Sequence, residues 1–132
     1  MSFDENISIY TRYMELVLTG DVARLPEVVD VKGYREECVG ITPGWIGYEQ
    51  AIESLGRQLA MIEKLSVEYD QIEVAGDKLF ARYHLHATPR GQATAVVTQG
   101  CDFIRIAAGK IVERWFLSDQ LTMLRQLGLL AG

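Results

Sequence analysis

The spacing of apolar residues changes once along this chain, and that change constrains the fold more than any other feature. Before Leu65, apolar side chains recur every three or four residues, which is the period of amphipathic helices. After Leu65 they alternate with polar side chains, which is the period of strands. Helices followed by a run of strands indicate an α+β fold. We expect a cone-shaped, curved antiparallel or mixed sheet with helices packed on its concave face.

Four helices are predicted from the apolar stripes and from the residues that begin and end them. Ser2 and Glu5 can form a capping box at the start of the first helix. Asp21 can cap a short second helix, although Pro26 falls inside it. The predicted helices cover residues 3–18, about 22–29, about 48–64 and 119–127, the last ended by Gly128.

Five extended segments are predicted, four of them as two hairpins. Gly76-Asp77 joins the first pair of long strands, and Ala107-Ala108-Gly109 joins the second. The expected segments are about 33–39, 66–75, 78–88, 94–106 and 110–118.

Length and composition fit one globular domain over residues 1–132. The net charge of −5 argues against nucleic acid as a partner, because phosphate binding needs clustered positive charge. No apolar run is long enough to cross a membrane, and no secretory signal is visible, so the cytoplasm is the expected location. Two cysteines and two histidines without a cluster predict no metal site, and we expect no cofactor.

The strand predicted at 78–88 carries one polar face. Arg82, His84 and His86 alternate with apolar residues and therefore share one side of the sheet. Periodicity leaves open whether that side lines a cavity, faces solvent or forms a subunit interface. In a cavity, a histidine could donate a hydrogen bond to a substrate carbonyl.

In the register expected for the hairpin at 107–109, residues that face one another have numbers that sum to 217. This register places Trp115 opposite Asp102 and Asp119 near Thr98, so these four side chains would share a face. A one-residue bulge would instead bring Gln99, Cys101 and Phe103 to that face. Asp102 could also be the partner of a nearby arginine.

Asp119 stands at the predicted start of the last helix, and two roles are open to it. In an apolar cavity its carboxylate would have a raised pKa and could serve as a general acid and base. As a helix N-cap it would accept amide hydrogen bonds, which lower the pKa. One carboxylate cannot easily do both.

Three aromatic residues are further candidates for ligand contact. Trp45 and Tyr48 lie in or next to a Gly-rich loop, and such loops often stand at the rim of a cavity. Tyr13 lies on the first helix, where packing in the core is the simpler expectation. Glu36-Glu37 is interpreted as a solvated strand end.

Several sequence features near the C-terminus are shared with one family. They are Gly109-Lys110-Ile111-Val112-Glu113-Arg114-Trp115, then Asp119, then Met123-Leu124-Arg125-Gln126-Leu127-Gly128, preceded by Asp102-Phe103-Ile104-Arg105. With these features the chain resembles the SnoaL-like polyketide cyclases of the nuclear transport factor 2-like superfamily. The element order resembles theirs over nearly the whole chain.

The resemblance implies a cofactor-independent cyclase or isomerase acting on a small apolar carbonyl compound. Asp119 would remove a proton α to the carbonyl, while His84, with Arg82 or a main-chain donor, would hold the enolate oxygen. It also implies a homodimer paired through the outer face of the sheet. A non-catalytic binding module of the same fold is the alternative, and epoxide hydrolysis, with Asp102 as a second pocket carboxylate, is a third.

Overall fold

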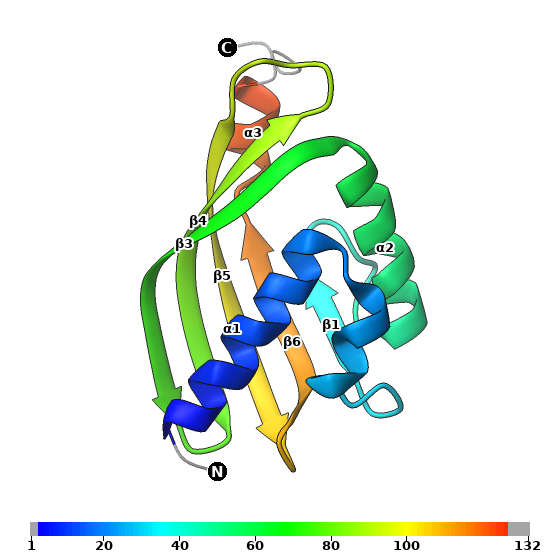
Figure 1. Cartoon of the computed structure of the whole chain (residues 1–132), viewed down its shortest axis with the longest axis vertical. Helices are drawn as coiled ribbons and strands as arrows, with labels where there is room; N and C mark the ends of the chain where they lie inside the picture. The colour runs from blue at the N-terminus through cyan, green and yellow to red at the C-terminus, as the bar shows by residue number, and fades with distance from the viewer. Residues whose placement is uncertain (1–2, 127–132) are drawn as a thin grey trace.

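The computed structural model describes residues 3–126 and orders them as helices followed by a meander of strands (Figure 1). This order confirms the predicted α+β class. The helices are α1 (Phe3–Thr19), the 3₁₀ helix η1 (Val22–Glu27), α2 (Tyr48–Ala60) and α3 (Gln120–Gln126). The strands are β1 (Arg35–Cys38), β2 (Ile46–Gly47), β3 (Ile62–Ala75), β4 (Lys78–Pro89), β5 (Val96–Ala107) and β6 (Lys110–Ser118).

The helices form where the spacing of apolar residues predicted them, but some of their predicted ends are wrong. Asp21 makes no side-chain hydrogen bond to η1, so the predicted cap there is wrong. The parts of the predicted caps that fall on Ser2 and Gly128 lie outside the described residues. Helix α2 ends at Ala60, four residues earlier than predicted, because the end of β4 pairs with the chain from Ile62 onward. The Arg90 amide also donates to the Met61 carbonyl at 2.9 Å.

The strands form one mixed sheet in the order β2-β1-β6-β5-β4-β3. Strands β3 to β6 are antiparallel neighbours joined in sequence, whereas β1 lies parallel to β6. In that parallel register Glu36 is the partner of Arg114, and Cys38 is the partner of Phe116. Segments about 80 residues apart in the sequence therefore share one face of the sheet.

Helices α1 and α2 cover the concave face of this curved, twisted sheet (Figure 1). A register shift between Tyr69 and Gln71 marks a bulge in β3, and bulges bend and twist the strands that carry them. The core lies between α1 and the sheet. Its largest fully buried side chains include Tyr10, Met14, Tyr83, Leu79 and Ile111.

The β5–β6 hairpin has a register that differs from the simple pairing. A shift between Arg105 and Ile106 moves the strands by one residue, so that Asp102 pairs with Phe116 and Phe103 pairs with Trp115. The predicted pairing of Trp115 with Asp102 is therefore wrong, and the one-residue bulge is present. Asp102 nevertheless stays on the buried inner face, and Gln99 and Phe103 are exposed. Trp115 faces the outer side of the sheet with Phe103, and their rings lie 5.5 Å apart.

Candidate functional site

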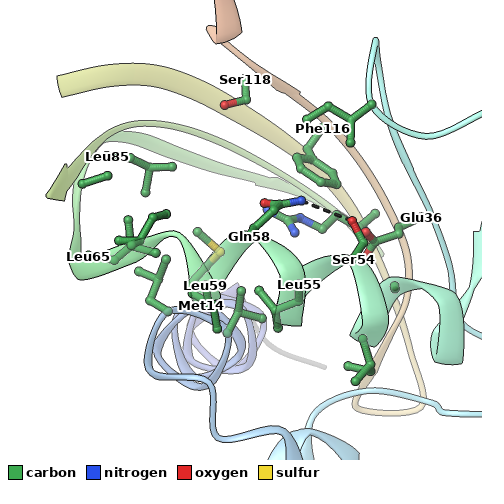
Figure 2. Close-up of a pocket in the computed structure, with 18 of the residues that line it drawn as sticks. Met14, Glu36, Ser54, Leu55, Gln58, Leu59, Leu65, Leu85, Phe116 and Ser118 are labelled. Carbon is green, nitrogen blue, oxygen red and sulfur yellow. Dashed lines mark hydrogen bonds between the residues drawn. The ribbon is translucent and has the colours of Figure 1, made fainter. Parts of the chain in front are cut away.

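A cavity of about 430 Å³ lies between the helices and the concave face of the sheet. Figure 2 shows Met14, Leu55 and Leu59 on the helix side, Phe116 and Ser118 on the sheet side, and Leu65 and Leu85 at one end. Most of its wall is hydrocarbon, which favours a largely apolar ligand. Its apolar lining includes Met14, Val17, Leu18, Leu25, Val29, Ile41, Ala51, Ile52, Leu55, Leu59, Leu65, Leu85, Ala87, Val96 and Phe116.

Polar groups gather at the opposite end of the cavity. Strand alternation places Tyr34, Glu36 and Cys38 on the inner face of the sheet, while Arg35 is exposed. Glu36 is only 7% exposed and lines the cavity. Within residues 3–126 it is the one carboxylate in the cavity wall. The cavity therefore combines an apolar wall with a single acidic group.

A chain of hydrogen bonds joins Glu36 to a buried arginine. The Tyr34 hydroxyl donates to Glu36 Oε1 at 2.6 Å, and the hydroxyls of Tyr34 and Tyr13 lie 3.3 Å apart. Arg114 Nη1 donates to the Tyr13 hydroxyl oxygen at 3.3 Å. The three links bring together α1, β1 and β6. Because every donor and acceptor in the chain is buried, water competes weakly for these bonds.

Asp102 lies behind the cavity wall and holds Arg114. Its Oδ1 accepts from Arg114 Nε at 3.1 Å and lies 3.0 Å from Arg114 Nη2. The hydroxyls of Tyr10 and Tyr83 donate to the same carboxylate at 2.5 and 3.1 Å. A Cβ at Gly100 would come within 2.7 Å of the Tyr83 ring, so glycine there allows Tyr83 to cross β5. Asp102 is fully buried and is an arginine partner, as the simpler interpretation of its sequence predicted.

Burial keeps the phenols protonated and the guanidinium charged. Loss of solvation raises the pKa of Tyr13 to about 12 and that of Tyr34 well above its ordinary value. Burial lowers the pKa of Arg114, but the nearby Asp102 carboxylate and the other anions outweigh that effect, and the net shift is upward. At neutral pH both tyrosines are therefore hydrogen-bond donors, and Arg114 carries its positive charge.

Helix α2 adds a second polar feature to the wall. Ser54 and Gln58 are one turn apart on the inner side of α2, and Gln58 Nε2 donates to Ser54 Oγ at 3.2 Å (Figure 2). In Figure 2 both side chains lie on the same side of the cavity as Glu36. They offer further polar contacts to a ligand that is bound there.

Asp119 is a helix cap in the structure. Its Oδ1 accepts the Thr122 amide at 3.0 Å, and the Thr122 hydroxyl donates to Oδ2 at 2.5 Å. These two bonds lower its pKa. The prediction of a raised pKa in an apolar hollow is wrong, because the first turn of α3 supplies amide and hydroxyl donors to the anion. Ser118 and Met123 line the cavity and Asp119 does not.

The polar face of β4 lies on the outer side of the sheet. Tyr83, Leu85 and Ala87 line the cavity, so Arg82, His84 and His86 point away from it. His84 Nδ1 lies 2.7 Å from Asp70 Oδ2, and His86 Nε2 lies 3.5 Å from Glu68 Oε2. The predicted pocket roles of these three residues are wrong because strand parity could not tell the two faces apart.

The remaining candidates divide between the two sides of the sheet. Tyr13 and Tyr48 line the cavity. Thr98 is buried on the inner face but is not among the residues that line the cavity. Trp115 donates from Nε1 to Glu37 Oε1 on the outer face, and Trp45 is 41% exposed beneath the Arg35 guanidinium. Neither tryptophan contacts the cavity.

Sequence reasoning missed three residues of the polar end, namely Tyr34, Glu36 and Arg114. Alternation around β1 was the available signal, because Glu36 falls between Tyr34 and Cys38 on one face and both of those side chains favour burial. A carboxylate flanked in this way is a candidate for a cavity wall. The partnership with Arg114 had no local signal, since it depends on the parallel pairing of β1 with β6.

The described residues contain no group of three or more histidine, cysteine or acidic side chains that could hold a metal ion. In the same range, no helix is both long and apolar enough to cross a membrane.

Comparisons with known proteins agree with this architecture. The model of the SnoaL-like polyketide cyclase family matches residues 7–127. No curated protein matches the chain. A candidate polyketide cyclase from Bacillus cereus superposes with a TM-score of 0.81 at 25% identity, covering 96% of this chain and 83% of that one.

Two other solved structures show how widely this fold is used. AclR, a candidate hydroxylase from Streptomyces galilaeus, superposes with a TM-score of 0.84 at 18% identity, covering 99% of this chain and 89% of that one. An epoxide hydrolase from Mycobacterium tuberculosis superposes with a TM-score of 0.74 at 16% identity, covering 94% of this chain and 90% of that one. Likeness at this identity concerns the fold, and the chemistry has to be argued from the site.

Proposed function

This chain belongs to the SnoaL-like polyketide cyclase family, and we propose that it catalyses a cofactor-independent cyclisation or isomerisation of a small apolar carbonyl compound, with Glu36 as the general base. The position of Glu36 carries this proposal. It is a buried carboxylate at the polar end of an apolar cavity, and Tyr34 occupies only one of its two oxygens. Asp119, which was the first candidate from sequence, is bound as a helix cap.

The proposed reaction begins with proton transfer to Glu36. Oε2 removes a proton from the carbon α to the substrate carbonyl, leaving an enolate. The enolate carbon then attacks a second carbonyl of the same molecule, forming a carbon–carbon bond and an alkoxide. The alkoxide takes back the proton from Glu36, so the enzyme returns to its starting state. In an isomerisation the proton returns to a different carbon instead.

Arg114 is the proposed electrostatic partner of the enolate. A guanidinium has five N–H groups, and three of them are used in the bonds to Asp102 and Tyr13. Arg114 lines the cavity and is the direct neighbour of Glu36 in the β1–β6 register. A fixed positive charge beside the base stabilises negative charge that develops in a largely apolar cavity.

Other candidate functions have weaker support. Epoxide hydrolysis by a pair of carboxylates needs a second acid in the cavity, and the only sequence candidate, Asp102, is buried behind its wall and fully engaged. A non-catalytic binding module remains the alternative, because it needs the same cavity but no base.

Deuterium exchange into a model ketone tests the proposed base directly. We expect the protein to accelerate exchange at the α-carbon of 2-tetralone in D₂O. Proton NMR measures this exchange as the loss of the α-proton signal. Glu36→Gln should reduce the rate at least about a hundredfold, because positioned proton transfer contributes that much or more. Glutamine keeps the shape of the side chain and an oxygen that can accept from Tyr34.

Asp119→Asn is the matched control and should retain the exchange rate. The proposal is wrong if Glu36→Gln exchanges as fast as the unmodified protein, or if Asp119→Asn alone abolishes exchange. A protein that binds 2-tetralone and related ketones without accelerating exchange in any of them is a binding module.

A further inference from the structure

The hydrogen bonds that connect Arg114 to Glu36 through two tyrosine hydroxyls allow only one assignment of donors and acceptors. Each phenol has a single proton. The Tyr34 hydroxyl donates its only hydrogen bond to the Glu36 carboxylate. In the bond between the two tyrosines the donor must therefore be the Tyr13 hydroxyl. The Tyr13 oxygen then accepts from Arg114 Nη1. The chain therefore runs from cation to anion, with every donor assigned.

We propose that Tyr34 is a positioning residue for Glu36, fixed in turn by Tyr13, and that it selects Oε2 as the oxygen that receives the substrate proton. This inference rests on the proposed function, in which Glu36 is the base. Tyr34 itself does not touch the reacting atoms. It acts by holding Oε1.

Local geometry makes Tyr34 suited to this role. Tyr34 directly precedes β1, Glu36 is the second residue of that strand, and both side chains are buried on the same side of the sheet. Tyr34 is 6% exposed, and its ring packs edge-on against the Tyr48 ring, with centroids 6.2 Å apart and planes at 83°. A buried, packed ring has few orientations, so its hydroxyl defines the position of Oε1 closely.

The second carboxylate oxygen is left for the ligand. Within residues 3–126, Tyr34 is the hydrogen-bond donor to Glu36, and its bond reaches Oε1. With Oε1 held at 2.6 Å, rotation of the carboxylate would break a short bond to a charged group. Oε2 therefore keeps one orientation relative to the cavity. General-base catalysis depends strongly on such orientation, because a displacement of about 1 Å can cost about a hundredfold in rate.

The protonation states support this assignment. The pKa of Tyr34 is raised well above its ordinary value, mainly by burial, and that of Tyr13 rises to about 12 for the same reason. Both phenols therefore keep their protons near neutral pH. Arg114 remains charged, since the paired Asp102 raises its pKa. The order of donors is thus stable under the conditions of catalysis.

Proton NMR of Tyr34→Phe gives a test that needs no substrate. A short bond from a phenol to a carboxylate gives a hydroxyl proton far downfield that exchanges slowly with water. We expect two such resonances in the unmodified protein, one from Tyr34 bonded to Glu36 and one from Tyr10 bonded to Asp102. The first should be lost in Tyr34→Phe and should move upfield in Glu36→Gln, where the acceptor is neutral, while the second stays in place. Tyr69→Phe is the matched control, because Tyr69 is a partly buried tyrosine elsewhere in the core, and it should leave the Tyr34 resonance in place.

Kinetics of 2-tetralone exchange then separate positioning from binding. Tyr34→Phe should lower the turnover number about tenfold to a hundredfold with little change in KM, since the lost bond was made to a charged group. Tyr13→Phe should have a smaller effect of the same kind. The inference is overturned if Tyr34→Phe turns over normally, if only KM changes, or if no downfield proton is lost in Tyr34→Phe and shifted in Glu36→Gln.

The two proposals fail in different ways. If Glu36→Gln remains active, the proposed base is wrong whatever Tyr34 does. If Glu36→Gln is inactive while Tyr34→Phe is unaffected, Glu36 is the base and Tyr34 only packs beside it.

Discussion

Two carboxylates of this chain show how environment assigns a role to a residue. Glu36 is buried at the end of an apolar cavity and accepts a bond from one phenol. Asp119 directly precedes α3 and accepts hydrogen bonds from the amide and the hydroxyl of Thr122. Those bonds lower the pKa of Asp119, so its contribution to stability is present above its ordinary value of 3.8 and lost as the pH falls through the lowered native value. The first environment suits a base, and the second suits a cap.

The ion pair of Asp102 with Arg114 connects stability to the site. The Asp102 side chain is fully buried and that of Arg114 is 9% exposed. Removing one partner of a buried pair leaves an uncompensated charge, whereas replacing both with apolar side chains often costs little.

We expect Asp102→Ala to lower the free energy of unfolding by about 3–5 kcal/mol, because Arg114 would remain charged without its partner. Urea unfolding measures this change. The double variant with Asp102→Leu and Arg114→Met should recover part of the loss. A single variant that is as stable as the unmodified chain would show that Arg114 finds another partner.

At the scale of elements, the β5–β6 hairpin decides which side chains reach the site. Its two-residue loop is Ala108-Gly109, with φ of 51° and 77°, between the paired residues Ala107 and Lys110. Both loop residues are left-handed, as in a type I′ turn, which matches the twist of antiparallel strands. Just beyond the turn, the shift at Arg105 sets the register that turns Asp102 inward and Trp115 outward.

The strained residue in this turn offers a test. Ala108 has a positive φ, which costs a residue with a Cβ about 1–2 kcal/mol, whereas asparagine tolerates this conformation better. We expect Ala108→Asn to raise the free energy of unfolding by about 1 kcal/mol in urea titrations. Gly109→Ala is the control and should destabilise the chain, because it adds a Cβ at φ 77°. An unchanged midpoint in Ala108→Asn would mean that the turn relaxes without cost.

At the scale of the whole molecule, the outer face of the sheet carries an exposed apolar patch. Phe103 is 51% exposed, Leu117 is 44% exposed and Val97 is 38% exposed. Phe103 also contacts Phe80 and Trp115, with ring centroids 5.1 and 5.5 Å away. Patches of this kind mark interaction surfaces.

We propose that a second copy of this chain covers that face, as the resemblance to the family first suggested. Analytical ultracentrifugation should give the mass of a dimer. Phe103→Glu should shift it to a monomer, because the variant would bury a charge at the contact. Val31→Glu is a suitable control, since this exposed side chain lies between η1 and β1, in a segment that does not belong to the strands of the patch. A monomer in the unmodified protein would exclude the proposal.

The sequence alone determined the family and, apart from the two-residue strand β2, the element types and their order. Local sequence features indicate the elements, such as the change of period at Leu65 and the turn residues Gly76 and Gly109, and a short motif near the C-terminus indicates the family. The boundary of α2 was misplaced because pairing with the end of β4 recruits the residues that follow Ala60.

Only the tertiary structure decided which residues form the site. A strand pattern of period two is the same whichever face is buried, so His84 and Arg82 could not be assigned to the outer face from sequence. Glu36 and Arg114 are 78 positions apart and meet because β1 lies parallel to β6. Pairings over such distances depend on packing of the whole chain, and no local window contains them.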